Sequence, residues 1–162
     1  MKISRMKLKM AIGAVLIGMG APLFYACNPV GNGYGLSGTG DPISDTTYFT
    51  NQVQPILTSR CVTCHKSGGS GYAATGLDLS AGNAYLNLLG SDGTGKVSSE
   101  VPTTLRVKPG SADNSYIYQK INPNPASGGR MPLDGSVLSS EQIDIIKTWI
   151  QNGAHGPEGT NP

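Results

Sequence analysis

The chain has 162 residues and a formal net charge of +2, and only 14% of its residues are charged, well under the roughly 25% of an average globular protein. Four of its twelve Lys and Arg residues lie within the first ten positions, which leaves eight against ten Asp and Glu, a net charge of −2, for the rest of the chain. This balance excludes a protein that binds nucleic acid by neutralising phosphates, and it leaves no basic patch for an anionic membrane surface.

The N-terminus has the pattern of an export signal. Residues 1–10 are basic, and residues 11–24 are apolar throughout. This apolar run is shorter than the roughly 20 residues of a membrane-spanning helix, whereas a basic start followed by a short apolar run is typical of a secretory signal. We therefore predict a signal peptide at residues 1–26.

The end of the apolar run, FYAC at residues 24–27, resembles the bacterial lipoprotein box, in which a small residue precedes a Cys that becomes the lipid-bearing N-terminus. The box prefers Leu where this chain has Phe24, and Leu23 lies one position earlier. Cleavage after Gly20 is an alternative that would leave Cys27 a free thiol. We expect lipidation of Cys27, which would anchor the protein on the periplasmic or cell-surface face of a bacterial membrane.

Residues 27–45 have the composition of a linker. Glycine stands at positions 31, 33, 35, 38 and 40, and the segment has no apolar period of 2 or 3.6 residues. We predict a lipidated N-terminus followed by a flexible tether, whose r.m.s. reach is about 20–25 Å.

Three short helices are predicted after the linker. The first covers residues 46–60, where Pro55 either begins the main segment or kinks it. The other two cover residues 83–89 and 113–121, and each is opened by Asn or Asp. Between them, residues 91–106 are predicted to be loop, and a brief extended piece is expected at residues 77–79.

The last helix has the clearest pattern. Ser139 and Gln142 have the spacing of a capping box, and Gly153 supplies the stop. Apolar residues at 143, 146 and 150 fall on one stripe, widened by residues 145 and 149. These elements predict one all-α domain at residues 46–156, followed by a tail at 157–162.

Residues 61–65, Cys61-Val62-Thr63-Cys64-His65, form a C-x-x-C-H motif, the attachment motif of c-type haem. Two thiols three residues apart on a helical turn can add to the two vinyl groups of one haem. The adjacent His65 then reaches the iron from the same face. The sequence therefore predicts one covalent haem c on Cys61 and Cys64, with His65 as the proximal iron ligand.

Other chemistries of this motif are less compatible with the rest of the chain. A zinc site needs four ligands, and only Cys27 and His155 remain among Cys and His. A thioredoxin-like dithiol belongs beside a βαβ unit, for which the sequence shows no pattern. A disulfide between Cys61 and Cys64 would close an unusually tight loop.

Several further segments accompany the motif in a recognisable order. They are YF at 48–49, VQPIL at 53–57, GLDLS at 76–80, RVKPG at 106–110, SYIY at 115–118, GRMP at 129–132 and a final helix containing Trp149. With the motif, they make residues 46–154 similar to the bacterial monohaem class I cytochromes c. The resemblance implies a small fold of four to five short helices around the haem. It also implies an electron carrier rather than an enzyme, acting alone or as a subunit of an oxidoreductase complex.

The sixth iron position has two candidate ligands outside the predicted signal peptide. Met131 is the one Met there, because the other four lie at positions 1–19. It sits in a loop of Gly128, Gly129 and Pro132, where backbone can approach a ring closely. His155 lies in a Gly-rich tail and fits a surface residue better. We predict ligation by Met131, and a thioether ligand raises the reduction potential.

The predicted function is single-electron transfer with redox protein partners at or near the membrane. A haem-based sensor or peroxidase-like enzyme with an open sixth iron position is the alternative. Five residues are candidates to contact the haem propionates, and the alternative for each is a solvated surface group. They are Arg106, Lys108, Tyr48, Tyr116 and Tyr118.

Overall fold

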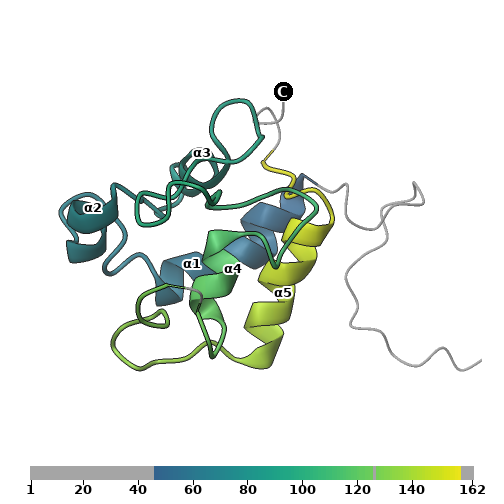
Figure 1. Cartoon of the computed structure of the whole chain (residues 1–162). Helices are drawn as coiled ribbons and strands as arrows, with labels where there is room; N and C mark the ends of the chain where they lie inside the picture. Colours follow the sequence, from purple (N-terminus) through teal and green to yellow (C-terminus); the bar gives the residue numbers. More distant parts are fainter. Residues whose placement is uncertain (1–45, 126, 158–162) are drawn as a thin grey trace, which may run out of the picture. The chain divides into compact units, whose positions relative to one another are not determined.

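The computed structural model describes residues 46–125 and 127–157, and this part of the chain is helical with no β-strand. A π-helical segment, η1 (Phe49–Val53), runs directly into α1 (Gln54–Arg60). The other elements are α2 (Ser70–Thr75), α3 (Ala84–Leu89), α4 (Tyr116–Ile121) and α5 (Ser140–Gln151) (Figure 1). The all-α prediction is confirmed for the described residues.

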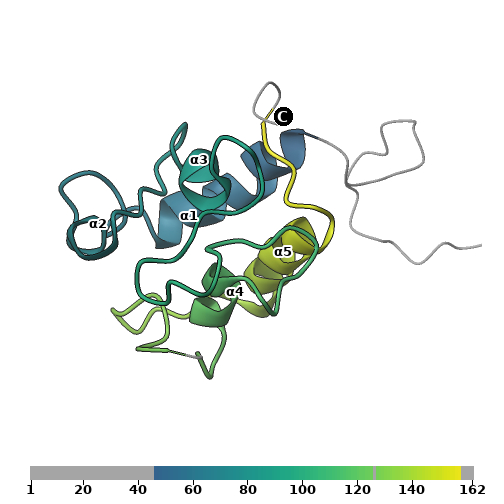
Figure 2. The same ribbon diagram turned by 45° about the horizontal axis from the view of Figure 1, so that its top comes forward.

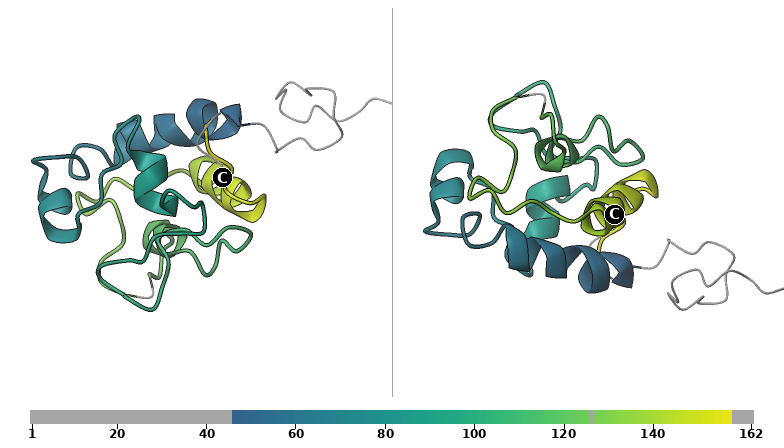
Figure 3. Two further views of the ribbon diagram at one scale, coloured as in Figure 1. Left: turned by 90° about the horizontal axis from the view of Figure 1, so that it is seen from above. Right: turned by 90° about the horizontal axis from the view of Figure 1, so that it is seen from below.

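An aromatic cluster joins the start and the end of this helical domain. The ring of Phe49 lies edge-on to Tyr85, with centroids 5.5 Å apart, and its centroid is 5.1 Å from that of Trp149. Through this cluster η1 packs on α5, and α4 packs beside α5 as well (Figure 2). Figure 1 shows α3 above both α1 and α4, and in the views of Figure 3, along that vertical direction, α3 projects between them. The core is therefore built from residues far apart in the sequence.

The capping box of α5 is confirmed. The backbone N–H of Gln142 donates to Ser139 Oγ at 3.2 Å, and that of Ser139 donates to Gln142 Oε1 at 3.1 Å. The helix ends at Gln151, and Gly153 follows with a φ of +94°, which only glycine adopts without strain. Its buried face consists of Ile146, Trp149 and Ile150, as the apolar stripe predicts.

The three short helices differ from prediction mainly at their starts. The segment predicted at 46–60 contains η1 and α1, and Pro55 lies in the first turn of α1, directly after the π-helical residues of η1. Asn83 is the N-cap of α3, but its side chain donates to Asp78 instead of capping. The predicted start at 113 is wrong. Ser115 precedes α4 and binds two loop backbones: its Oγ accepts from Lys108 N and donates to Ser111 O.

Two features were not predicted. Helix α2 forms within a glycine-rich segment that carries no helical apolar pattern, and it stops where Gly76 adopts a φ of +65°. An isolated bridge pairs Val97 with Leu105 inside the segment predicted to be loop. The extended piece expected at residues 77–79 is not a strand, although Leu79 N donates to His65 O at 2.8 Å.

The predicted signal peptide, Cys27 and the linker lie outside the described residues, as does most of the predicted tail. Within residues 46–125 and 127–157, no helix is long and apolar enough to cross a membrane.

Candidate functional site

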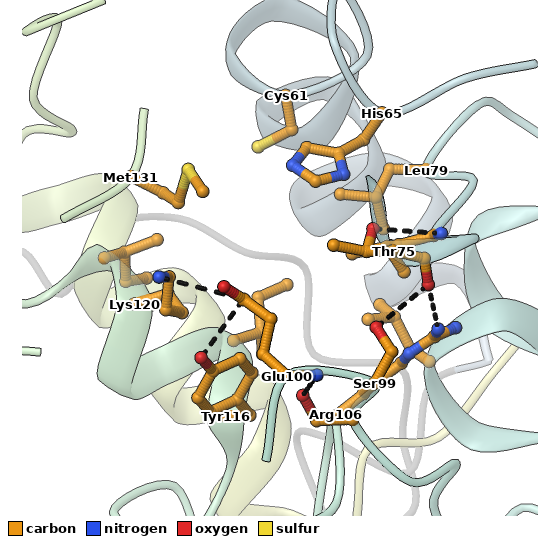
Figure 4. Close-up of a pocket in the computed structure, with 15 residues that line it drawn as sticks. Cys61, His65, Thr75, Leu79, Ser99, Glu100, Arg106, Tyr116, Lys120 and Met131 are labelled. Carbon is orange, nitrogen blue, oxygen red and sulfur yellow. Dashed lines mark hydrogen bonds and ion pairs between the residues drawn. The ribbon is translucent and has the colours of Figure 1, made fainter. Parts of the chain in front are cut away.

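A cavity lies between the C-x-x-C-H segment, α3, α4 and the loops before and after α4. It is partly open to solvent, and about 610 Å³ of space in and around it, open solvent included, is free of protein atoms. Its lining residues are Cys61, His65, Thr75, Leu77, Leu79, Leu88, Ser98, Ser99, Glu100, Arg106, Tyr116, Ile117, Lys120, Ile121 and Met131 (Figure 4).

The end of α1 places the motif beside this cavity. Cys61 N donates to Leu57 O at 2.9 Å, and His65 N donates to Cys61 O at 2.9 Å, so helix-like turns continue from α1 into the motif. The side chains of Cys61 and His65 then point into the same space (Figure 4). Cys64 is exposed and is not among the lining residues.

His65 presents one ring nitrogen to the cavity (Figure 4). Its other nitrogen, Nδ1, is buried and lacks a well-formed hydrogen bond. Burial lowers the pKa of His65 below its usual value, although the Leu77 backbone and the Glu100 carboxylate act in the opposite direction. At neutral pH the ring is therefore uncharged, the form in which imidazole ligates a metal.

The two motif thiols are unpaired in this structure. Burial raises the pKa of Cys61 to about 11, although the charge of Arg60 opposes the shift. Cys61 is consequently protonated at neutral pH, whereas a redox-active dithiol requires a lowered thiol pKa. Cys61 therefore lacks the activated thiolate of a thioredoxin-like nucleophile.

Met131 reaches the cavity from the loop after α4. Its backbone N–H donates to Lys120 O at 2.7 Å, and Arg130 Nε donates to Ile121 O at 3.0 Å, so two bonds fasten the loop to the end of α4. The Met131–Pro132 peptide bond is cis. In Figure 4 the Met131 and His65 side chains lie on opposite sides of the same space.

Arg106 is the one predicted propionate contact that is both cationic and in the cavity lining. It is only 8% exposed, so a solvated surface position is excluded. Its guanidinium donates to Asn87 O at 2.9 Å and to Thr75 O at 3.0 Å. Burial lowers the pKa of Arg106 from its ordinary value, which leaves the group charged.

Two charged lining residues, Glu100 and Lys120, were not predicted. Lys120 is 6% exposed, donates to Ser127 O at 3.2 Å and lies 3.8 Å from the Glu100 carboxylate. The Tyr116 hydroxyl donates to the same carboxylate at 3.1 Å. A helical pattern could have revealed Lys120, because residues 116, 117, 120 and 121 fall on one face of α4.

The remaining candidates lie elsewhere. Lys108, Tyr48 and Tyr118 are absent from the cavity lining, and Lys108 is exposed. His155 is exposed too, and its backbone carbonyl accepts a hydrogen bond from Trp149 Nε1 at 2.9 Å. The structure thus brings together Cys61, His65, Arg106, Tyr116 and Met131 from the predicted set.

Comparisons with protein-family models, with curated proteins and with solved structures find no match to this chain. Within the described ranges, no three His, Cys, Asp or Glu side chains are grouped as ligands for a bare metal ion.

Proposed function

We propose that this protein is a c-type cytochrome that carries single electrons between redox partners. Its domain at residues 46–156 would hold one covalent haem in the manner of the class I cytochromes c, and lipid on Cys27 would tether it to a membrane. The side chains that meet in the cavity favour this function over other uses of the cavity.

The observation that carries the proposal is the convergence of Cys61, His65 and Met131 on one cavity. Cys61 and His65 come from the motif, and Met131 comes from a loop 66 residues after His65 along the chain. Cys61 and His65 lie on one side of the space and Met131 on the other (Figure 4). One thiol of the motif and two potential iron ligands are thus available to one haem.

The rest of the cavity also suits a large, mainly apolar ligand with acidic groups. Apolar side chains line much of it: Leu77, Leu79, Leu88, Ile117 and Ile121. Arg106 and Lys120 are the lining cations, and either could neutralise a propionate. The uncharged His65 ring offers a nitrogen lone pair, so the lining residues fit the group, and the exposed Cys64 would have to turn toward the cavity to form the second thioether.

Each site residue then has a defined role. The thiols of Cys61 and Cys64 would form the two thioether bonds to the haem, and His65 and Met131 would ligate its iron. The bound haem would supply reversible one-electron chemistry at its iron. Two protein ligands leave no position for a substrate, as suits a carrier rather than an enzyme.

Haem attachment gives the decisive test. Full-length protein is produced in a host that matures c-type cytochromes and then denatured in acid acetone. Because thioethers are covalent, one haem should stay with each chain, and Cys64→Ala should leave at most a poorly matured, singly attached product. Haem that extracts freely from the wild type would refute the proposal.

The second ligand is tested on the oxidised holoprotein. A Met-to-ferric charge-transfer band should be present in the wild type and absent from Met131→Ala, while His155→Ala keeps it. A high-spin wild-type spectrum with rapid binding of cyanide or CO would favour the sensor or peroxidase-like alternative.

The tether is tested by labelling. The wild type should incorporate labelled fatty acid and partition with membranes, and Cys27→Ser should do neither. An unlipidated wild-type N-terminus after Gly20 would contradict the anchor and leave the electron-transfer proposal standing.

A further inference from the structure

The first turn of α2 lies directly on the C-x-x-C-H segment. Tyr72 N donates to Cys64 O at 3.0 Å, and Gly69 N donates to Lys66 O at 2.8 Å. Two glycines make this approach possible. A Cβ on Gly69 would collide with Cys64 O, and a Cβ on Gly71 would collide with the imidazole of His65.

The Gly71 contact involves the face of the His65 ring. A Cβ there would lie 2.8 Å from Cε1 and 2.9 Å from each ring nitrogen. A point beyond the ring edge would be much farther from the nitrogens than from Cε1. The near-equal distances therefore place the Cβ position of residue 71 over the ring face. The imidazole therefore lies flat against the bare α-carbon of Gly71.

Glycine is otherwise an unfavourable choice at this place. In a helix it is destabilising relative to alanine, and α2 has only six residues and no side-chain N-cap. The following helical positions, Ala73 and Ala74, are exposed and carry the best helix former. The glycine at position 71 thus makes the helix less stable, and it does so at the place where a side chain would collide with the imidazole.

We propose that Gly71 is a positioning residue for His65, because its missing side chain fixes the plane and direction in which the imidazole enters the cavity. The inference rests on the proposed role of His65 as an iron ligand. Any side chain at position 71 would push the ring from its present plane, since the ring and the α2 backbone are already in contact. The ligand geometry would change while both ligating residues stay in place.

The test compares holoproteins carrying Gly71→Ala or Gly71→Val with the wild type and with Ala74→Ser, an exposed site on the same helix. The readouts are the g-values of the ferric low-spin EPR signal and the midpoint potential, with denaturant unfolding measured in parallel. Both readouts should shift in Gly71→Ala and shift further in Gly71→Val, and Ala74→Ser should match the wild type. Folded Gly71 variants with wild-type g-values and potential would overturn the inference.

A second measurement covers variants that fail to mature. The structure shows the contact between Gly71 and His65 without haem, so NMR of the haem-free protein can report on it. Gly71→Ala should shift the resonances of the His65 ring, and Ala74→Ser should leave them unchanged. Unchanged His65 resonances in Gly71→Ala would overturn the inference. Wild-type protein without covalent haem would instead refute the proposed function, so the two failures are distinguishable.

Discussion

The cavity has two walls that arise in different ways. The motif wall consists of Cys61, His65, Leu77 and Leu79, and the charged wall consists of Glu100, Arg106, Tyr116 and Lys120. The motif wall is built within 19 consecutive residues, joined by bonds such as Leu79 N to His65 O. The charged wall combines a loop with α4, through contacts between residues 16 and 20 positions apart.

Local sequence spacing is thus enough to bring the residues of the motif wall together, whereas the residues of the charged wall meet only through tertiary contacts. A C-x-x-C-H motif keeps its ligands together because each lies within a turn or two of the next. Buried charges depend instead on partners that only the folded chain supplies. Substitutions in each wall, followed by measurements of stability and of the pKa of His65, test this difference between the walls.

The largest effect is expected from Arg106→Met. The substitution removes two hydrogen bonds from a charged donor to the carbonyls of Asn87 and Thr75, and relief of guanidinium burial offsets part of the loss. The free energy of unfolding should fall by about 2 kcal/mol, measured by chemical denaturation. Lys108→Met, at an exposed position two residues away, should change it by less than about 0.5 kcal/mol. Equal losses of unfolding free energy in Arg106→Met and Lys108→Met would mean that the charged wall is no more important for stability than the surface.

Much of the fold could be predicted from sequence, and the reasons are local. The capping box at Ser139 and the stop at Gly153 need only their own residues, so α5 was correct at both ends. Of the two alternatives for Pro55, a start of the main segment or a kink, the start agrees with α1, which begins at Gln54. The start of α4 was missed because Ser115 binds Lys108 and Ser111, contacts that no local propensity reveals.

The site shows the same division. Cys61, His65 and Met131 were predicted from residue type and spacing, and these three line one cavity, whereas Cys64 of the motif does not. Helix α2 was missed because its glycines disfavour a helix and their contacts with Cys64 and His65 are tertiary. Lys120 and Glu100 were missed because a charged residue is assigned to the surface unless its burying partner is known.

A smaller loss of stability is expected from Lys120→Met. The ammonium loses its bond to Ser127 O and its ion pair with Glu100, but Glu100 is 40% exposed and can turn to water. The free energy of unfolding should fall by about 1 kcal/mol. Lys147→Met on α5 is the matched control. If Lys120→Met lost more stability than Arg106→Met, the order that we expect for these two residues of the charged wall would be reversed.

The motif wall should make stability pH-dependent in the haem-free domain. Burial lowers the pKa of His65 in the folded state, so the unfolded chain binds a proton more readily as the pH falls through about 6.5. Stability should therefore be complete above that pH and decline below it, toward the lower folded pKa. His65→Gln should remove the decline between pH 7.5 and 5, and His155→Gln should keep it. A decline that persists in His65→Gln would assign it to another group.

The smallest effect joins the two walls. The Glu100 carboxylate raises the pKa of His65, opposing burial, while Arg106 and Lys120 lower it. Glu100→Gln removes the favourable charge, so the pKa of His65 should fall further in an NMR titration of the haem-free domain. The shift should be modest because Glu100 is partly exposed, and added salt should reduce it, since exposed charges are screened over about 8 Å at physiological ionic strength. Glu141→Gln, at an exposed position in the first turn of α5, should leave the titration unchanged. Loss of a nearby negative charge can only disfavour the imidazolium. A rise in the pKa of His65 in the Glu100→Gln variant would therefore mean that the charged wall acts on His65 by packing.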